Sequence, residues 1–317
     1  MKYTSQQNTL VNTNISDNNV KYQWVYNLTP SNTIEFDPLT FPSIKKRWQS
    51  TKQKGNLGGV AAFVNEEMVG LILVELLPKA AEIISFFVTP QYQHQGIGHQ
   101  LLQNLEKALI KLQCPQIKLK YRVSELTTSA LESILNKQKW LPPKTDFLIT
   151  KATIESLSQA PWVYKYPLPK KFTVFPWTEL TDAEKARIRD RKAYPDVLSP
   201  FMEDTRLEPL NSLGLRYEGE VIGWTINHRI DSETIRYSVM FVEERFQRMG
   251  RGFSLLTEAV KRQIDSGIPY ATAAVSSSNS SMLHCVERYH KPYAMLISES
   301  RYSYKNLSRA NASKFRV

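Results

Sequence analysis

The sequence of 317 residues is poor in cysteine and has no long apolar run. Its two cysteines, Cys114 and Cys285, lie far apart without metal-ligand spacing, which argues against a disulfide framework or a metal site and favours a reducing compartment. The apolar stretch 68–77 is interrupted by Gly70 and Glu75 and is too short to cross a bilayer. Residues 1–19 lack the apolar core of a secretion signal and are predicted to be a mobile polar leader. We expect a cytoplasmic protein.

The net charge of +11 predicts anionic partners. A nucleic acid, a polyphosphate cofactor and an acidic peptide would each satisfy this charge. The longest basic tract is only residues 45–47, and no nucleic-acid-binding signature is present. Nucleic acid is therefore the weakest of the three candidates.

An internal repeat organises the chain. The segment 63–111 and the segment 216–263 both read as an apolar strand, a turn, a second apolar strand and a glycine loop. The loop residues Gln93, Gly96 and Gly98 recur 154 positions later as Gln247, Gly250 and Gly252. Two copies in register over about fifty residues indicate two related domains.

Each copy predicts an antiparallel meander followed by a helix. Apolar strands alternate with short polar turns before each loop, and the apolar period becomes helical after it. A further strand, a further helix and closing strands follow in both copies. A proline-rich stretch separates the copies and is predicted to be a linker. The predicted domains are 20–158 and 172–317, joined by the linker 159–171.

The glycine loops predict two anion-binding sites. A strand that turns through Gln-x-x-Gly-x-Gly into a helix aims backbone N–H groups and the positive end of the helix dipole at one point. Glycine leaves room for the anion and permits the required backbone angles. No Gly-Lys-Ser/Thr follows either loop, so neither is a nucleotide P-loop, and the preceding meander does not fit a dinucleotide fold.

These loops and their flanking strands resemble the GNAT superfamily of acyl-coenzyme A-dependent N-acyltransferases. The likeness covers residues 20–155 and 172–307. It implies an α/β (α+β) fold of two domains, each with a mixed, mainly antiparallel sheet flanked by helices. It also implies that acetyl-CoA or a longer acyl-CoA is the co-substrate and that an amine, on a small molecule or a peptide, is the acceptor. The residues that would hold coenzyme A are Val88, Gln93, His94, Gln95, Gly96, Ile97, Gly98, Val242, Gln247, Arg248, Met249, Gly250, Arg251, Gly252 and Asn279.

The sequence departs from the family pattern at the proton donor. Family members often carry a tyrosine on the helix after the fifth strand, and the matching positions here are Leu135 and Val286. Tyr289 lies one helical turn further and either protonates the thiolate or packs in the core. Asn279 matches a frequent family asparagine and is also a good helix N-cap.

A general base is needed because an ammonium must lose a proton before its nitrogen attacks a thioester. His228 is the best candidate because histidine as a residue type ordinarily titrates near working pH, and Glu75 occupies the equivalent place in the first copy. Glu208, with Glu203 and Asp204, precedes the second strand of the second copy and could hold or deprotonate an amine. Each of these side chains is alternatively a structural polar group.

The second copy carries more of the expected chemistry. Arg248 and Arg251 add positive charge to its loop, and its third strand is more polar. We therefore predict that the C-terminal domain catalyses acyl transfer, of acetyl or a fatty acyl group, to an amine such as a Lys or Orn side chain or a peptide N-terminus. The alternative is a non-catalytic acyl-CoA-binding or sensing protein, which the missing tyrosines favour.

Overall fold

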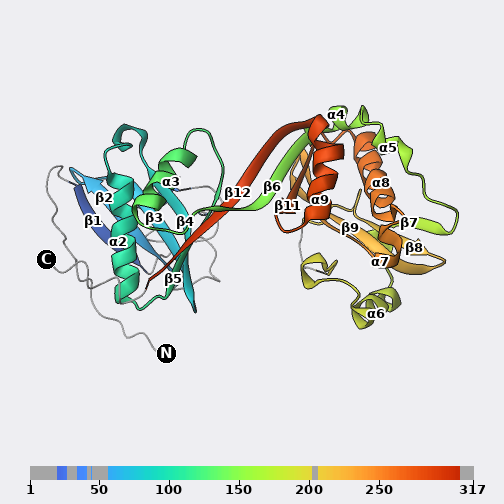
Figure 1. Cartoon of the computed structure of the whole chain (residues 1–317), viewed down its shortest axis with the longest axis horizontal. Helices are drawn as coiled ribbons and strands as arrows, with labels where there is room; N and C mark the ends of the chain where they lie inside the picture. The colour runs from blue at the N-terminus through green and yellow to red at the C-terminus, as the bar shows by residue number, and fades with distance from the viewer. Residues whose placement is uncertain (1–19, 27–33, 41–43, 45–55, 202–205, 308–317) are drawn as a thin grey trace. The chain divides into compact units, whose positions relative to one another are not determined.

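The computed structural model describes residues 20–26, 34–40, 44, 56–201 and 206–307. The chain forms two compact units, residues 1–145 with 300–317 and residues 146–299 (Figure 1). The predicted leader 1–19 lies outside the described residues. Each unit contains one of the two repeats, as the sequence predicts.

Unit 1 is a sheet with the strand order β1-β2-β3-β4-β5-β12. Its meander of β2, β3 and β4 is antiparallel, and β4 and β5 are parallel. Asn65 and Glu66 make the β2–β3 turn with φ of 49° and 68°, as a tight hairpin requires. The elements are β1 (Val20–Tyr26), η1 (Ile34–Leu39), β2 (Leu57–Val64), β3 (Glu67–Leu77), β4 (Ala80–Val88), η2 (Pro90–Tyr92), α2 (Ile97–Lys111), β5 (Gln116–Arg122) and α3 (Thr128–Lys137).

Unit 2 repeats this plan with the strand order β12-β6-β11-β10-β9-β8-β7. The pair β10–β11 is parallel, and β7 to β10 form an antiparallel meander. The elements are β6 (Lys144–Thr153), α4 (Ile154–Ser158), α5 (Trp162–Lys165), β7 (Phe172–Pro176), η3 (Trp177–Glu179), α6 (Asp182–Arg191), η4 (Asp196–Leu198), β8 (Leu213–Tyr217), β9 (Glu220–Asp231), β10 (Thr234–Val242), α7 (Glu244–Gln247), α8 (Arg251–Ser266), β11 (Tyr270–Ser276), α9 (Ser280–Cys285), a π-helical turn (Val286–His290), η6 (Lys291–Tyr293) and β12 (Ala294–Asn306).

The closing strands are exchanged between the units. β6 follows the helix α3 of unit 1, yet from residue 146 it belongs to unit 2 and pairs with β11. β12 follows α9 of unit 2, yet from residue 300 it belongs to unit 1 and pairs with β5. The predicted boundaries, 20–158 and 172–317, do not contain this exchange. The sequence predicts where strands form, but it does not identify which strands pair, because every strand edge offers the same backbone groups.

Buried polar contacts hold β12 in unit 1. The Nζ atom of Lys305 lies 2.5 Å from a carboxylate oxygen of Glu106 and 2.7 Å from the carbonyl oxygen of Gln138. The Ser303 hydroxyl donates to the Leu141 carbonyl at 2.6 Å. The last strand of the chain is therefore tied to α2 and to the segment after α3.

The predicted linker 159–171 is part of unit 2 instead of a spacer. Trp162 and Val163 on α5 are buried against Val260 of α8 and Ala271 of β11. Burial of a tryptophan there stabilises unit 2 through apolar area removed from water. The prolines end the regular strand and helix periods, but the aromatic residues between them return the chain to the core.

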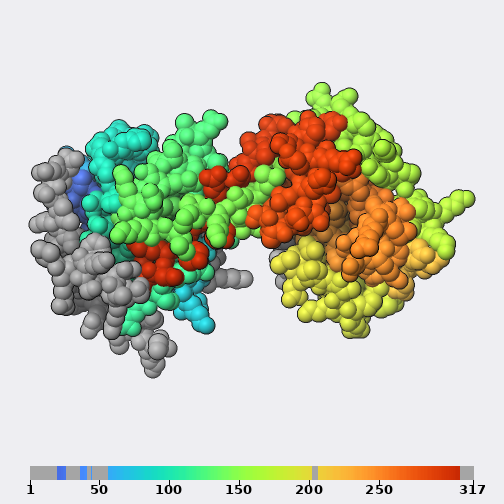
Figure 2. All heavy atoms as spheres, viewed as in Figure 1, coloured from blue at the N-terminus to red at the C-terminus, as the bar shows by residue number. Residues whose placement is uncertain are grey.

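One amphipathic helix packs against each meander. On α2 the residues Leu101, Leu102, Leu105 and Leu109 are fully buried, as the helical period predicts. On α8 the buried residues are smaller and more polar, including Ser254, Thr257 and Gln263. Figure 2 shows α9 and the chain after it beside α8 on the surface of unit 2.

Candidate functional site

Two parallel strands of unit 2 separate at the centre of the sheet. β10 and β11 pair from Thr234↔Tyr270 to Tyr237↔Ala273, and no pair between them follows. At the same level β10 contains a bulge, because its register against β9 shifts between Tyr237 and Val239. A bulge bends a strand and interrupts its ladder. Beyond it, the facing backbone groups of β10 and β11 are available to a ligand.

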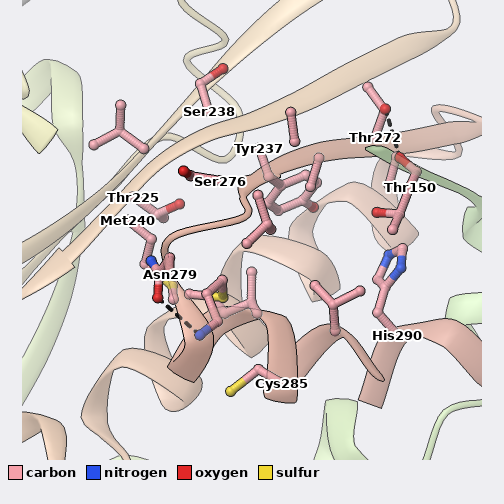
Figure 3. Close-up of a pocket in the computed structure, with 18 of the residues that line it drawn as sticks. Thr150, Thr225, Tyr237, Ser238, Met240, Thr272, Ser276, Asn279, Cys285 and His290 are labelled. Atoms are coloured by element: carbon pink, nitrogen blue, oxygen red, sulfur yellow. Dashed lines mark hydrogen bonds between the residues drawn. The ribbon is translucent and has the colours of Figure 1, made fainter. Parts of the chain in front are cut away.

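A cavity of about 630 Å³ lies at this divergence. Its walls come from both faces of the sheet: Val197 and Leu198 of η4 on one, and Leu256 and Val260 of α8 on the other. Figure 3 shows labelled lining residues from β6, β9, β10, β11 and α9, with the side chains gathered around the gap between the strands. The cavity thus crosses the sheet where the two strands separate.

The second glycine loop leads from β10 into α8. Gly250 is the N-cap of α8 with φ of 73°, and an ideal Cβ atom on it would meet nothing within 4 Å. The Gln247 side chain donates to the carbonyl of Val242 at 2.7 Å and fixes the loop to the strand end. The first intrahelical donor is the amide of Ser254, so the amides of the preceding turn have no acceptor within the helix. This is an open, electropositive helix end.

The two arginines of the second loop differ in their exposure and in their contacts. Arg248 is exposed, whereas the guanidinium of Arg251 lies 4.9 Å from the centre of the Phe172 ring. The Nε atom of Arg251 is buried and has no hydrogen-bond partner. Met249 is half exposed. Arg251 thus packs on β7 and keeps an unused donor beside the loop.

The first glycine loop has the same backbone plan. Gly96 is the N-cap of α2 with φ of 83°, and its ideal Cβ atom would also meet nothing within 4 Å. Gln93 donates to the Val88 carbonyl at 2.9 Å, as Gln247 does to Val242. His94 has a φ of 61°, an angle uncommon for a residue with a side chain. Gln95 bonds the Gln91 carbonyl, and Ile97 is buried in the core.

The space next to the first loop is filled by side chains. An ideal Cβ atom on Gly98 would lie 3.1 Å from Ile134 and 3.7 Å from the ring of Phe86. In unit 2 the positions equivalent to Phe86 and Ile134 are Met240 and Cys285, which both line the cavity. Phenylalanine and isoleucine thus pack beside the first loop, whereas the equivalent methionine and cysteine line the cavity. The two loops are alike, but their surroundings are not.

His228 lies beside the bulge. Its Nδ1 atom is 2.7 Å from the hydroxyl oxygen of Ser238, the bulge residue, and Ser238 lines the cavity. Since His228 is only partly buried and is not among the lining residues, it meets the cavity through Ser238. The equivalent pair in unit 1 is Glu75 and Ile84, which cannot form this hydrogen bond.

Glu208 is buried and makes structural contacts. It is 5% exposed, one oxygen lies 2.5 Å from Nε of Arg229, and the other accepts the Leu210 amide at 3.0 Å. It does not line the cavity. Both oxygens are engaged, so this carboxylate is poorly placed to accept a proton from a substrate. Glu203 and Asp204 lie outside the described residues.

Tyr289 and Asn279 both line the cavity. The Tyr289 ring packs 4.7 Å from the Phe253 ring, and its hydrogen bond with Tyr166 raises the pKa of Tyr166. The Asn279 side chain accepts the Met282 amide at 3.0 Å and caps α9. Leu135 and Val286, the positions of the family's tyrosine, are both buried, Leu135 in the core of unit 1 and Val286 in the wall of the cavity.

Sequence reasoning missed several polar residues of the cavity, among them Ser238, Thr150 and His290. His290 reads in the sequence as a surface residue of a helix, but the chain enters a π-helical turn at Val286 and the ring faces inward. Burial lowers the pKa of His290 and raises the pKa of the Cys285 thiol. A bulge and a π-turn both shift side chains by one position, and neither can be recognised from the spacing of apolar residues in the sequence.

The described residues contain no group of His, Cys, Asp and Glu that could hold a metal ion. In the same part of the chain no helix is long and apolar enough to span a membrane.

Comparison with known proteins gives one family and several structures. The profile described as the acetyltransferase (GNAT) family matches residues 22–130 and 173–290. No curated protein matches the sequence. A tandem GNAT protein from the clavulanic acid biosynthesis pathway superimposes with a TM-score of 0.61 at 10% identity, covering 90% of this chain and 99% of that one. A GCN5-related N-acetyltransferase from Sphaerobacter thermophilus gives 0.56 at 14% identity, covering 90% and 96%. At these identities the likeness concerns the fold, with both units included.

Proposed function

The chain belongs to the acetyltransferase (GNAT) family as a two-domain member, and from this premise we propose that it transfers an acyl group from acyl-coenzyme A to the nitrogen of an amine, in unit 2. The observation that carries the assignment to unit 2 is the cavity at the divergence of β10 and β11. Phe253, which follows the second glycine loop, and Ser238, the hydrogen-bond partner of His228, both line it.

The donor would bind along the open edges of β10 and β11. The amides of the first turn of α8 would take the pyrophosphate, since they point away from the helix and carry the positive end of its dipole. The pantetheine arm carries amide groups that pair with backbone groups left without a strand partner beyond Tyr237. The thioester would then lie beside the bulge, where Ser238 meets the cavity.

Ser238 and His228 would move the proton. As the amine nitrogen attacks the thioester carbon, the Ser238 hydroxyl accepts a proton from nitrogen and donates its own to Nδ1 of His228. The C–N bond forms, the C–S bond breaks, and the thiolate leaves and takes up a proton from water, while His228 returns its proton to water. Backbone amides at the bulge are suitably placed to stabilise the negative oxygen of the intermediate. His228 is preferred to Glu208 because the Glu208 oxygens already have partners.

Tyr289 is better explained as a packing residue than as the proton donor. Its ring belongs to a cluster with Phe253 and Trp162, and its hydroxyl group already shares a hydrogen bond with Tyr166. The acceptor would approach from the opposite face, where Val197 and Leu198 of η4 line the cavity. Amines on small molecules and on peptides fit this assignment.

The test is acyl transfer by the purified full-length protein. Acetyl-CoA and acyl-CoAs of increasing length are combined with amines that include Lys and Orn side chains and peptide N-termini. We expect free thiol to be released in the same amount as acylated amine measured by mass spectrometry. Binding of acyl-CoA without thiol release from any amine would support a binding or sensing protein instead, and absence of binding would refute both functions.

A further inference from the structure

The cavity continues sideways from the divergence, across β11 to β6. The row Tyr237, Ala273 and Thr150 follows directly from the strand registers, and all three residues line the cavity. The small side chains of Ala271 and Ala273 leave space for this side arm. Val260 of α8 and His290 of the π-turn also line it. The arm therefore extends beyond the place assigned to the thioester, away from the glycine loop.

The arm contains polar atoms without partners. The Oγ1 atom of Thr150, Nδ1 of His290 and Nε1 of Trp162 are buried and make no hydrogen bond. Thr150 is 1% exposed and Trp162 is 6% exposed, and both line the cavity. Figure 3 shows the ring of His290 pointing toward Thr150, whose own carbonyl is taken by Thr272. Buried polar groups in native proteins are nearly always paired, so these atoms point to a polar ligand group.

The ligand group must be uncharged. Among the described residues no Lys, Arg, Asp or Glu lines the cavity, so a carboxylate or an ammonium at the end of the arm would lack a counter-ion there. Burial lowers the pKa of His290, which keeps its ring neutral near pH 7. Thr150 and His290 can each donate or accept, and Trp162 can donate. A hydroxyl or a carbonyl oxygen satisfies this set.

Within the proposed acyl transfer, on which this inference rests, we propose that the donor carries a medium-length acyl chain with a neutral oxygen substituent, and that Thr150 and His290 recognise this oxygen. Neighbouring strands lie about 4.8 Å apart, so Thr150 is roughly 7 Å across the sheet from the gap that would hold the thioester. An extended chain advances about 1.2 Å per bond, by analogy with the backbone. The oxygen is thus expected about six bonds from the thioester carbon.

Two matched donors test the proposal. 6-Hydroxyhexanoyl-CoA and heptanoyl-CoA differ only by a hydroxyl in place of a methyl group at the chain end. Their dissociation constants are measured by titration calorimetry with the full-length protein, without an amine, and free coenzyme A is titrated as a reference. Hydroxyacyl-CoAs of five and eight carbons, each with its methyl analogue, locate the oxygen along the arm.

We expect at least one hydroxyacyl-CoA to bind about tenfold more tightly than its methyl analogue. Thr150→Val should remove this preference without weakening free coenzyme A, and His290→Phe should reduce it. The matched control is Thr257→Val, a buried threonine on α8 that does not line the cavity, which should keep the preference. Thr150→Val removes a hydroxyl that has no partner, so its melting temperature should not fall.

The outcomes separate this inference from the proposed function. Methyl analogues that bind as tightly as the hydroxyacyl-CoAs at every length would overturn it and leave acyl transfer intact. A preference that survives in Thr150→Val, or a Thr150→Val variant that loses affinity for free coenzyme A, would also overturn it. In the latter case Thr150 would hold pantetheine. Failure of all the coenzyme A compounds to bind would overturn the function itself.

Discussion

Alanine in place of each loop glycine should separate the roles of the two loops. Gly250 and Gly96 are both helix N-caps with positive φ, 73° and 83°, and a Cβ atom would meet nothing in either place. The two substitutions therefore have the same local cost. They differ in what the new methyl group would obstruct, which is the anion assigned to the second loop.

The cost to folding is set by the backbone angle. A residue with a Cβ atom in the left-handed region costs about 1–2 kcal/mol relative to glycine. For a unit of this size, 1 kcal/mol lowers the melting temperature by about 2–4 °C. We expect Gly250→Ala and Gly96→Ala each to melt about 2–8 °C below the wild type, measured by differential scanning calorimetry.

The cost to binding should be unequal. A methyl group at residue 250 would stand between the amides of α8 and the pyrophosphate, and a hydrogen bond to a charged group is worth about 1.5–3 kcal/mol. Gly250→Ala should therefore weaken coenzyme A binding roughly 10- to 100-fold in titration calorimetry, while Gly96→Ala leaves it unchanged. Equal losses would place donors on both loops, and a loss in Gly96→Ala alone would refute the assignment to unit 2.

Three further predictions follow from contacts in unit 2. His228→Gln and Ser238→Ala should each lower kcat about 100-fold with unchanged coenzyme A affinity, and unchanged kcat in both would eliminate the relay. Met240→Phe installs the side chain of Phe86 and should abolish donor binding in calorimetry without lowering the melting temperature; retained binding would contradict the cavity assignment. Glu184 has its pKa lowered to about 2 by its hydrogen bonds to Arg216 and Thr181, so its stabilisation is full above pH 4.5 and lost toward pH 2. In urea unfolding Glu184→Gln should cost about 2–3 kcal/mol at pH 7 and progressively less below pH 4.5; a difference independent of pH would contradict this origin.

The meanders and loops are predictable because their signals are local. Turn residues such as Asn65 and Gly219 adopt positive φ at the hairpins, and Gly96 and Gly250 do so at the helix starts. These angles favour particular residue types, so the sequence carries them. The apolar stripes of α2 and α8 also follow from the helical period.

The cavity is not predictable in the same way because its walls come from distant segments. Thr150 reaches it only because β6 pairs with β11, and Trp162 only because α5 packs on α8. His290 faces it because of a π-turn. None of these arrangements follows from a local period, since each depends on which partner a strand or helix selects.

The difference between the units is nevertheless present in the sequence once the registers are known. The bulges of β4 and β10 align, so that Ile84 corresponds to Ser238 and Glu75 to His228. The repeat offset is 153 along β3 and β9, as from Glu75 to His228, and 154 along β4 and β10, as from Phe86 to Met240. Alignment of the glycine loops, which uses the offset of 154, therefore identifies the cavity-lining Met240. The proton-relay pair takes one residue from each strand of the hairpin, so it requires both offsets. A comparison of the two hairpins by strand register, instead of by sequence offset, would have paired His228 with Ser238. It would have distinguished unit 2 from unit 1 by this polar pair as well as by the cavity.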